Sequence, residues 1–121
     1  MLKGWTPILR MFDPDLARGF YIDWLGFEVA FEHRFFEGAP LYLGLVRDGH
    51  DLHLSEHHGD STPGTRVRMA VDDIDALYAE LASRPYRGAN PGPPQMQEWG
   101  EKDLTLTDPF ANKITFHEAI R

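Results

Sequence analysis

Residues 99–118 read WGEKDLTLTDPFANKITFHE, and this stretch decides the fold of the C-terminal half. Polar and apolar residues alternate over 103–107 and again over 114–117, which is the two-residue period of strands with one buried face. Between them, Asp108–Asn112 is predicted to form a turn, because its proline fixes φ and lacks an N–H group and Asn112 tolerates a left-handed backbone. The stretch is therefore a hairpin with one apolar and one polar face.

The bulk properties narrow the possible functions. The chain has 121 residues and a formal charge of -7, with 19 acidic against 12 basic residues. This size fits one domain over 1–121, and dimerisation would add buried surface that a chain this small lacks. The negative charge disfavours nucleic acid and anionic membranes as partners. There is no cysteine, signal peptide or membrane-length apolar run, so we expect a cytoplasmic location.

The same order of strands and helix appears twice along the chain. We expect strands at 6–12, 27–32, 41–46 and 51–56 and a helix over 13–25 in a first unit, 1–58. A polar linker follows, and the pattern restarts in a second unit, 64–121, with a strand at 66–71 and a helix over 74–81. Aspartates precede both helices as caps, and apolar side chains such as Leu16, Phe20 and Trp24 recur at helical spacing. The repetition indicates an internal duplication.

Several short segments occur together in a known order: Thr6-Pro7-Ile8-Leu9, Trp24-Leu25-Gly26-Phe27, Ile74–Glu80, Trp99-Gly100 and the Asp108-Pro-x-x-Asn112 turn. In this order and spacing the chain resembles the glyoxalase, bleomycin resistance and dioxygenase (vicinal oxygen chelate) superfamily, and most closely its bleomycin resistance proteins. The resemblance implies an α+β fold. Two tandem βαβββ modules would form curved mixed sheets, with the helices on the convex side.

Side-chain polarity divides the expected sheets into two faces. The helix-facing layer would hold Leu9, Met11, Leu52, Leu54, Val67, Met69, Leu104, Leu106, Ile114 and Phe116. The concave face would hold Thr6, Ile8, Arg10, His53, Ser55, Arg66, Arg68, Thr105, Thr107, Thr115 and His117. Hydroxyl, imidazole and guanidinium groups suit a cavity for a polar ligand, although a solvated sheet face would show the same polarity.

The resemblance also locates the positions where enzymes of the superfamily hold a metal. These positions carry Thr6, His53, Arg66 and Thr115 here. Only His53 is a good ligand, and an arginine would repel a cation, so we predict no metal and no other cofactor. An alternative stays open, a metal-dependent glyoxalase-like lyase or dioxygenase with a displaced metal at His53 and either His57 or His117.

In bleomycin resistance proteins a planar part of the drug is gripped between aromatic side chains in two composite crevices of a dimer. The resemblance places Trp99 and Tyr42 at such positions, although Trp99 could instead pack beneath the Pro-rich loop at 88–94. Phe35 and Phe36 suggest a crevice rim or a dimer contact. The expected ligand-binding set is completed by Arg66, Arg68, His53, Thr105, Thr115, His117 and Glu98.

The chemistry of the ligand is less determined than its shape. Acidic residues near the two aromatic positions would concentrate a cation: Glu98, Glu101 and Asp103 beside Trp99, and Glu37 and Asp48 near Tyr42. In contrast, two arginines on the concave face would favour a carboxylate, phenolate or quinone oxygen. We expect a homodimer that sequesters a planar aromatic antibiotic or metabolite without chemistry. The enzyme described above and an accessory protein of a biosynthetic cluster are the alternatives.

Overall fold

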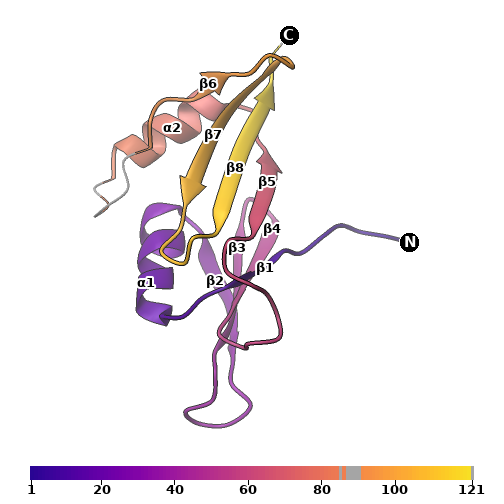
Figure 1. The fold of residues 1–121 in the computed structure, drawn as a ribbon, viewed down its shortest axis with the longest axis vertical. Helices are drawn as coiled ribbons and strands as arrows, with labels where there is room; N and C mark the ends of the chain where they lie inside the picture. The colour runs from indigo at the N-terminus through magenta and orange to yellow at the C-terminus, as the bar shows by residue number, and fades with distance from the viewer. Residues whose placement is uncertain (85, 87–90, 121) are drawn as a thin grey trace.

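The computed structural model describes residues 1–84, 86 and 91–120 (Figure 1). The elements, in chain order, are β1 (Ile8–Arg10), α1 (Pro14–Arg18), the π-helical η1 (Gly19–Trp24), β2 (Glu28–His33), β3 (Tyr42–Arg47), β4 (His50–Ser55), β5 (Arg66–Ala70), α2 (Ile74–Ala82), β6 (Gln95–Met96), β7 (Glu101–Thr107) and β8 (Lys113–Ala119). They form two four-stranded sheets, with strand orders β1-β4-β3-β2 and β5-β8-β7-β6. The predicted α+β class is confirmed.

The two sheets repeat one topology. In each, the strand that precedes the helix lies at an edge and pairs in parallel, β1 with β4 and β5 with β8, while the other pairs are antiparallel. Figure 1 shows the sheets following one another along the long axis, with α1 and α2 on the same side. The sheet of β1 to β4 is called the first sheet, and the sheet of β5 to β8 the second sheet.

The helix predicted over 13–25 is present, but it is not regular throughout. Asp13 caps it as expected, since its carboxylate accepts from the N–H groups of Asp15 and Leu16. From Gly19 the helix widens into π turns, which rotate the following side chains relative to α-helical spacing. The expected stripe beginning at Leu16 was therefore wrong at its first member, which is 44% exposed. The buried face is instead formed by Ala17, Phe20, Tyr21 and Trp24.

One hydrophobic core joins the two sheets. The inward-facing residues predicted from the alternation are buried in β1, β4, β7 and β8, whereas Val67 and Met69 on the edge strand β5 are only partly buried. Phe20, Tyr21 and Trp24 are at most 2% exposed and pack between the two halves of the chain. Burying such side chains contributes about 1.5–3 kcal/mol each, so the halves are expected to unfold together.

The turn between β7 and β8 differs from the prediction in one detail. Ala111, with φ of 68°, takes the left-handed conformation that was assigned to Asn112. Asn112 is fully buried and hydrogen-bonds instead, because its amide donates to the Asp108 carboxylate and to the carbonyl of Arg10. The asparagine is therefore required for its side chain, not for its backbone freedom.

We expect Ala111→Gly to stabilise the protein. A left-handed backbone strains any residue with a Cβ, whereas glycine adopts it freely, so the free energy of unfolding should rise by about 0.5–1 kcal/mol. Urea unfolding measures the change. Gly59→Ala, at an exposed position without positive φ and with open space around it, is the matched control for a change of backbone freedom. An unchanged or lower value for the Ala111 variant would contradict the strain.

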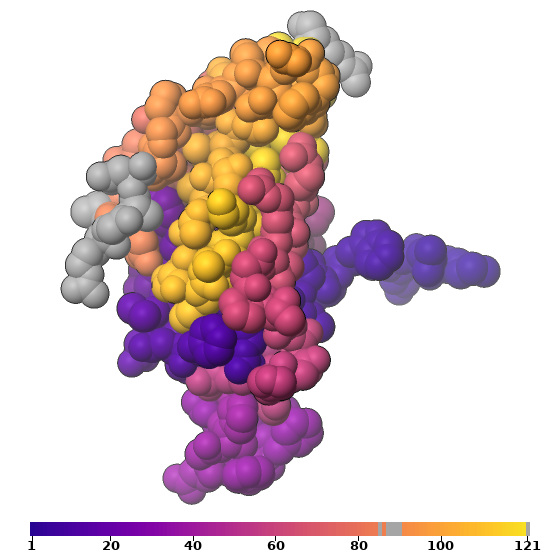
Figure 2. All heavy atoms as spheres, in the orientation of Figure 1, coloured from indigo at the N-terminus to yellow at the C-terminus, as the bar shows by residue number. Residues whose placement is uncertain are grey.

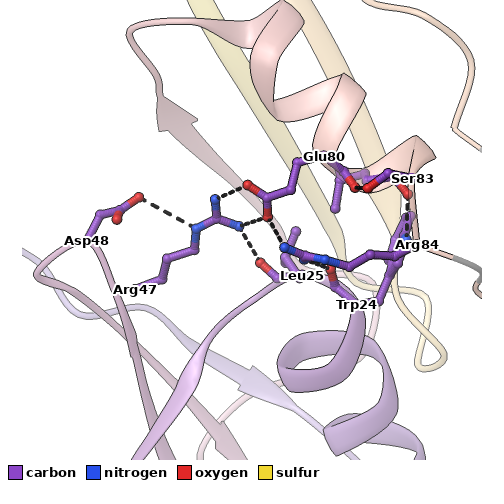
Figure 3. Close-up of polar contacts among 8 residues, drawn as sticks. Trp24, Leu25, Arg47, Asp48, Glu80, Ser83 and Arg84 are labelled. Carbon is purple, nitrogen blue, oxygen red and sulfur yellow. Dashed lines mark hydrogen bonds and ion pairs between the residues drawn. The ribbon is translucent and has the colours of Figure 1, made fainter.

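The two halves are also joined by an ion-pair clasp, formed by Arg47, Glu80 and Arg84 (Figure 3). Both nitrogens of the Arg47 fork donate to the Glu80 carboxylate, at 2.8 and 2.9 Å, and Arg84 Nη2 lies 2.7 Å from the same group. The guanidiniums also donate to the carbonyls of Leu25 and Trp24, where the first helix ends. The clasp thus ties β3 and the first helix to α2.

The clasp predicts how stability depends on pH. Burial raises the pKa of Glu80, but the hydrogen bonds and charges of Arg47 and Arg84 outweigh it and hold the pKa below its ordinary value. A depressed pKa contributes stability that is fully present above the unfolded value, and this contribution is lost as pH falls from about 5 through the lowered pKa of the folded state. Glu80→Gln should lower the free energy of unfolding by about 1–2 kcal/mol at pH 7 and flatten its fall over that range.

Urea titrations at a series of pH values measure this effect. Asp72→Asn, an exposed acid without a hydrogen bond or ion pair to the described residues, should leave the slope unchanged. Equal slopes for the Glu80 variant and the unmodified protein would show that the clasp contributes nothing.

Two segments stand clear of the body. The N-terminal arm, residues 1–6, extends away from it with Leu2 and Trp5 nearly fully exposed (Figure 2). At the lower end of Figure 2 the connection between β2 and β3 protrudes and carries the exposed Phe35 and Phe36. Among the described residues there is no helix long and apolar enough to cross a membrane.

Candidate functional site

The outward face of the first sheet carries an aromatic patch, formed by Phe31, His33, Phe35, Tyr42, His53 and His57. The rings of Phe31 and Tyr42 are nearly parallel, at 11°, with centroids 6.1 Å apart. His53 meets both rings edge-on, and its Nδ1 lies 2.8 Å from the Tyr42 hydroxyl. His33, Phe35 and His57 continue the contacts towards the protruding loop. The strand register places His33 opposite Tyr42, so the two groups of rings are neighbours on this face.

Gly44 makes room for the patch. It lies opposite both Phe31 and His53 in the strand register, in the middle of the aromatic side chains. A Cβ at this position would be only 2.1 Å from the Phe31 ring, so any other residue would displace that ring. A glycine inside a strand often marks such a close approach.

Phe31 reaches this face because β2 is irregular. The register with β3 shifts between Val29 and Phe31, so an extra residue, Ala30, is inserted into the strand. Simple alternation places Phe31 with Phe27 and Val29 on the core side, and the bulge turns it to the opposite face. Phe31 was therefore not expected on this face from the sequence, in which the usable signal is Gly44 of the facing strand.

On the second sheet, Glu101 is the centre of a polar network with Trp99, Arg68 and His117. Trp99 Nε1 donates to Glu101 Oε1 at 2.8 Å, and Arg68 Nη2 donates to the same oxygen at 3.1 Å. His117 Nδ1 lies 2.7 Å from Glu101 Oε2. The hydrogen bond from Trp99, followed by the contacts with His117 and Arg68, lowers the pKa of Glu101 against the effect of desolvation. The carboxylate therefore stays charged and holds the indole ring in place.

Trp99 itself is 63% exposed, so its ring is available to a ligand. This contradicts the alternative in which it packs beneath the Pro-rich loop, of which 88–90 lie outside the described residues. From 91 to 94 the chain has no regular structure before the two-residue β6, which the sequence pattern did not indicate.

The polar residues predicted for the concave face are divided between the two sheets. Arg66 Nη1 donates to Thr115 Oγ1 at 2.8 Å, and Thr105 and Thr115 share a hydrogen bond of 2.9 Å on the second sheet. Thr115 is only 1% exposed, so it supports the surface instead of contacting a ligand. Tyr42, His53 and Phe35 lie on the first sheet or beside it. Glu98 and Phe36 are exposed and join neither group in the described structure.

The proposed acidic field beside the aromatic residues was wrong in two respects. Asp48 lies in the turn after β3 and contacts Arg47, whereas Tyr42 begins that strand about 20 Å away at strand rise. Asp103 accepts from Gln97, and Glu101 is occupied as described above. These carboxylates are therefore committed to protein partners or distant from the patch.

The histidines considered for a displaced metal are likewise used elsewhere. His53 pairs with Tyr42, His57 packs against Phe35, and His117 bonds Glu101 on the other sheet. Within the described ranges no three His, Cys, Asp or Glu side chains are arranged to hold a metal ion.

A cavity of about 510 Å³ lies apart from both groups, beside the ion-pair clasp. Its walls come from the turn between β3 and β4 and from the segment that joins β5 to α2, with Leu25, Phe27 and Phe116 among its apolar lining. It therefore belongs to the junction of the two halves.

Comparisons with known proteins place the chain in a family. The model for glyoxalase superfamily proteins matches residues 1–121, so this protein belongs to the glyoxalase superfamily. The superfamily predicted from the sequence is thus confirmed. A comparison with curated protein sequences gave no match.

Solved structures of bleomycin-binding and antibiotic-binding proteins share the fold. A bleomycin-binding protein complexed with bleomycin is 23% identical, with a TM-score of 0.73 over 97% of this chain and 98% of that one. The bleomycin resistance determinant encoded on transposon Tn5 is 22% identical, with a TM-score of 0.73 over 98% of each chain. TnmS3, an antibiotic binding protein from Streptomyces sp. CB03234, is 22% identical, with a TM-score of 0.74 over 98% of this chain and 97% of that one. At these identities the likeness establishes the architecture alone.

Proposed function

We propose that this protein binds and sequesters a planar aromatic antibiotic or metabolite without a metal and without chemistry. The observation that carries the proposal is Trp99, whose exposed indole ring is held in place by Glu101. Stacking on an aromatic side chain contributes about 1–3 kcal/mol per ring, by analogy with stacked bases, and it favours flat conjugated ligands. The bleomycin-binding and antibiotic-binding proteins of the same fold support a binding role.

A homodimer is part of this proposal. The aromatic patch and Trp99 lie on different sheets of one chain, and no ring contact joins them in the described structure. If the first sheet of one copy faces the second sheet of the other, each of two crevices gains aromatic groups from both chains. The N-terminal arm also exposes the apolar side chains of Leu2 and Trp5, which would be buried by contact with a second copy.

The test is a fluorescence titration of the protein with bleomycin and with planar aromatic polyketides. We expect quenching of tryptophan emission, and we expect Trp99→Ala to weaken binding at least tenfold, because the stacked ring is lost. Trp5→Phe is the control, because it removes the exposed tryptophan of the N-terminal arm and keeps an apolar aromatic side chain there. Quenching that is unchanged in the Trp99 variant would exclude the stacking role.

Two further measurements complete the test. Metal analysis of protein purified without a histidine tag addresses the enzyme alternative, since stoichiometric iron, zinc or nickel would contradict metal-free binding. Sedimentation equilibrium addresses the dimer, and a monomer at concentrations that bind ligand would exclude composite crevices.

A further inference from the structure

Two cations stand side by side on the outward face of the second sheet. Arg66 on β5 and Lys113 on β8 are partners in the strand register, so their side chains lie on the same face, as does that of Thr115 two residues along. Both are exposed, and neither forms an ion pair with a carboxylate of the described residues. In a chain with a net charge of -7, an adjacent pair of uncompensated cations is unexpected.

Arg68, the other arginine predicted for the concave face, differs from Arg66 because it forms an ion pair. Its guanidinium is bound to Glu101, which also binds Trp99 and His117. The charge of Arg68 is therefore compensated within the protein, and its position serves the network that holds the indole. On this face, Arg66 and Lys113 therefore remain available to attract an anion.

The Arg66 side chain is also fixed in direction. Its Nη1 donates to Thr115 Oγ1 at 2.8 Å, and the buried Thr115 is held in turn by Thr105. One N–H group is used in this contact, which leaves other donors of the guanidinium for a ligand. An oriented guanidinium binds the two oxygens of a carboxylate or sulfonate better than a mobile one, because less side-chain entropy is lost.

We propose that Arg66 and Lys113 bind an acidic group of the aromatic ligand, so that the ligand class is a planar aromatic acid. This inference rests on the proposed function. The Arg66 guanidinium is directed along the sheet to Thr115, which is four residues from Ala119, the register partner of Glu101, so the acidic group lies about 13 Å at strand rise from the level of the Glu101 network that carries Trp99. A flat polycyclic ligand with a carboxylate, sulfonate or ionised phenol at one end spans that distance.

Two dyes with the same ring system test the inference. 1-Anilinonaphthalene-8-sulfonate carries an acidic group, and N-phenyl-1-naphthylamine lacks it, so the comparison isolates the charge. We expect Arg66→Gln and Lys113→Gln each to weaken binding of the sulfonate about five- to tenfold and to change binding of the neutral dye less than twofold. Added salt should weaken only the sulfonate.

Lys102→Gln is the matched control, because it also removes one positive charge from the second sheet but from a side chain that pairs with Asp75 of α2. It should change the binding of either dye less than twofold. The urea midpoint of each variant verifies that it is folded.

The outcomes separate the two proposals. Equal weakening of both dyes, or no preference of the unmodified protein for the sulfonate, would overturn the anion subsite while leaving aromatic binding intact. Loss of the sulfonate preference in the Lys102 variant would assign the effect to general charge and would also overturn it. If the neutral dye does not bind and Trp99→Ala has no effect on the sulfonate, the proposed stacking function itself is wrong.

Discussion

Asp108→Ala is expected to lower the free energy of unfolding by about 4 kcal/mol, the largest stability effect of any change considered. The Asp108 carboxylate is 5% exposed and accepts four hydrogen bonds. The donors are the Tyr21 hydroxyl at 2.6 Å, the Asn112 amide, and the backbone N–H groups of Phe110 and Asn112. Each buried donor left unpaired costs about 1–3 kcal/mol, so their sum far exceeds the value of one bond.

The hydrogen bond from Tyr21 links Asp108 to a distant part of the chain. Burial, and then the charge of Asp108, raise the pKa of the Tyr21 phenol far above its ordinary value, so the hydroxyl remains a donor at any physiological pH. The bond joins the first helix to the turn of the second sheet. Tyr21→Phe should cost only about 1 kcal/mol, because it removes a single donor and leaves the other three bonds in place.

Urea unfolding of the two variants and of Asp72→Ala measures the difference. Asp72 is an exposed acid, and its removal should change stability by less than about 0.5 kcal/mol. If Asp108→Ala costs no more than Tyr21→Phe, the backbone N–H groups of the turn must find other partners, and the account of the turn is wrong.

The second large effect concerns binding. Gly44→Ala should weaken binding of a planar aromatic ligand at least tenfold while the protein stays folded. The new Cβ would lie 2.1 Å from the Phe31 ring, and that ring is 43% exposed, so it can swing away from the sheet. The stack of Phe31 on Tyr42 is then lost, at a cost in stability of about 1–2 kcal/mol.

The measurement is a titration followed by tryptophan fluorescence, with bleomycin and planar polyketides. Phe31→Ala should weaken binding to a similar degree, since it removes the ring that Gly44→Ala displaces. Gly59→Ala, where the added methyl group meets open space, should bind as the unmodified protein does. Full affinity in the Gly44 variant would show that the first sheet takes no part in binding.

Several residues of the candidate site were named from the sequence, but the contacts between them were not. Trp99, Tyr42, His53, Arg66 and Arg68 were expected from the sequence, yet it did not indicate that Glu101, rather than Glu98, holds the indole. Both acids are close to Trp99 in sequence. Only the strand register brings Arg68 of β5 and His117 of β8 to the side chain of Glu101.

The sequence by itself determined the class of fold. The alternation over residues 99–118, the capping aspartates Asp13 and Asp73 and the glycine at Gly26 are local signals, and local backbone preferences act before any tertiary contact forms. The division into units 1–58 and 64–121 is a prediction of the same kind.

Tertiary structure alone decided which face each irregular residue occupies. The bulge in β2 turns Phe31 outward. The π turns that begin at Gly19 place Phe20, Tyr21 and Trp24 in the core, whereas Leu16, in the α-helical turn before them, lies outside it. Within 99–118, Asn112 and Asp108 are buried against Arg10 and Tyr21 from the far end of the chain. Such partners are set by packing, because the two halves share one core.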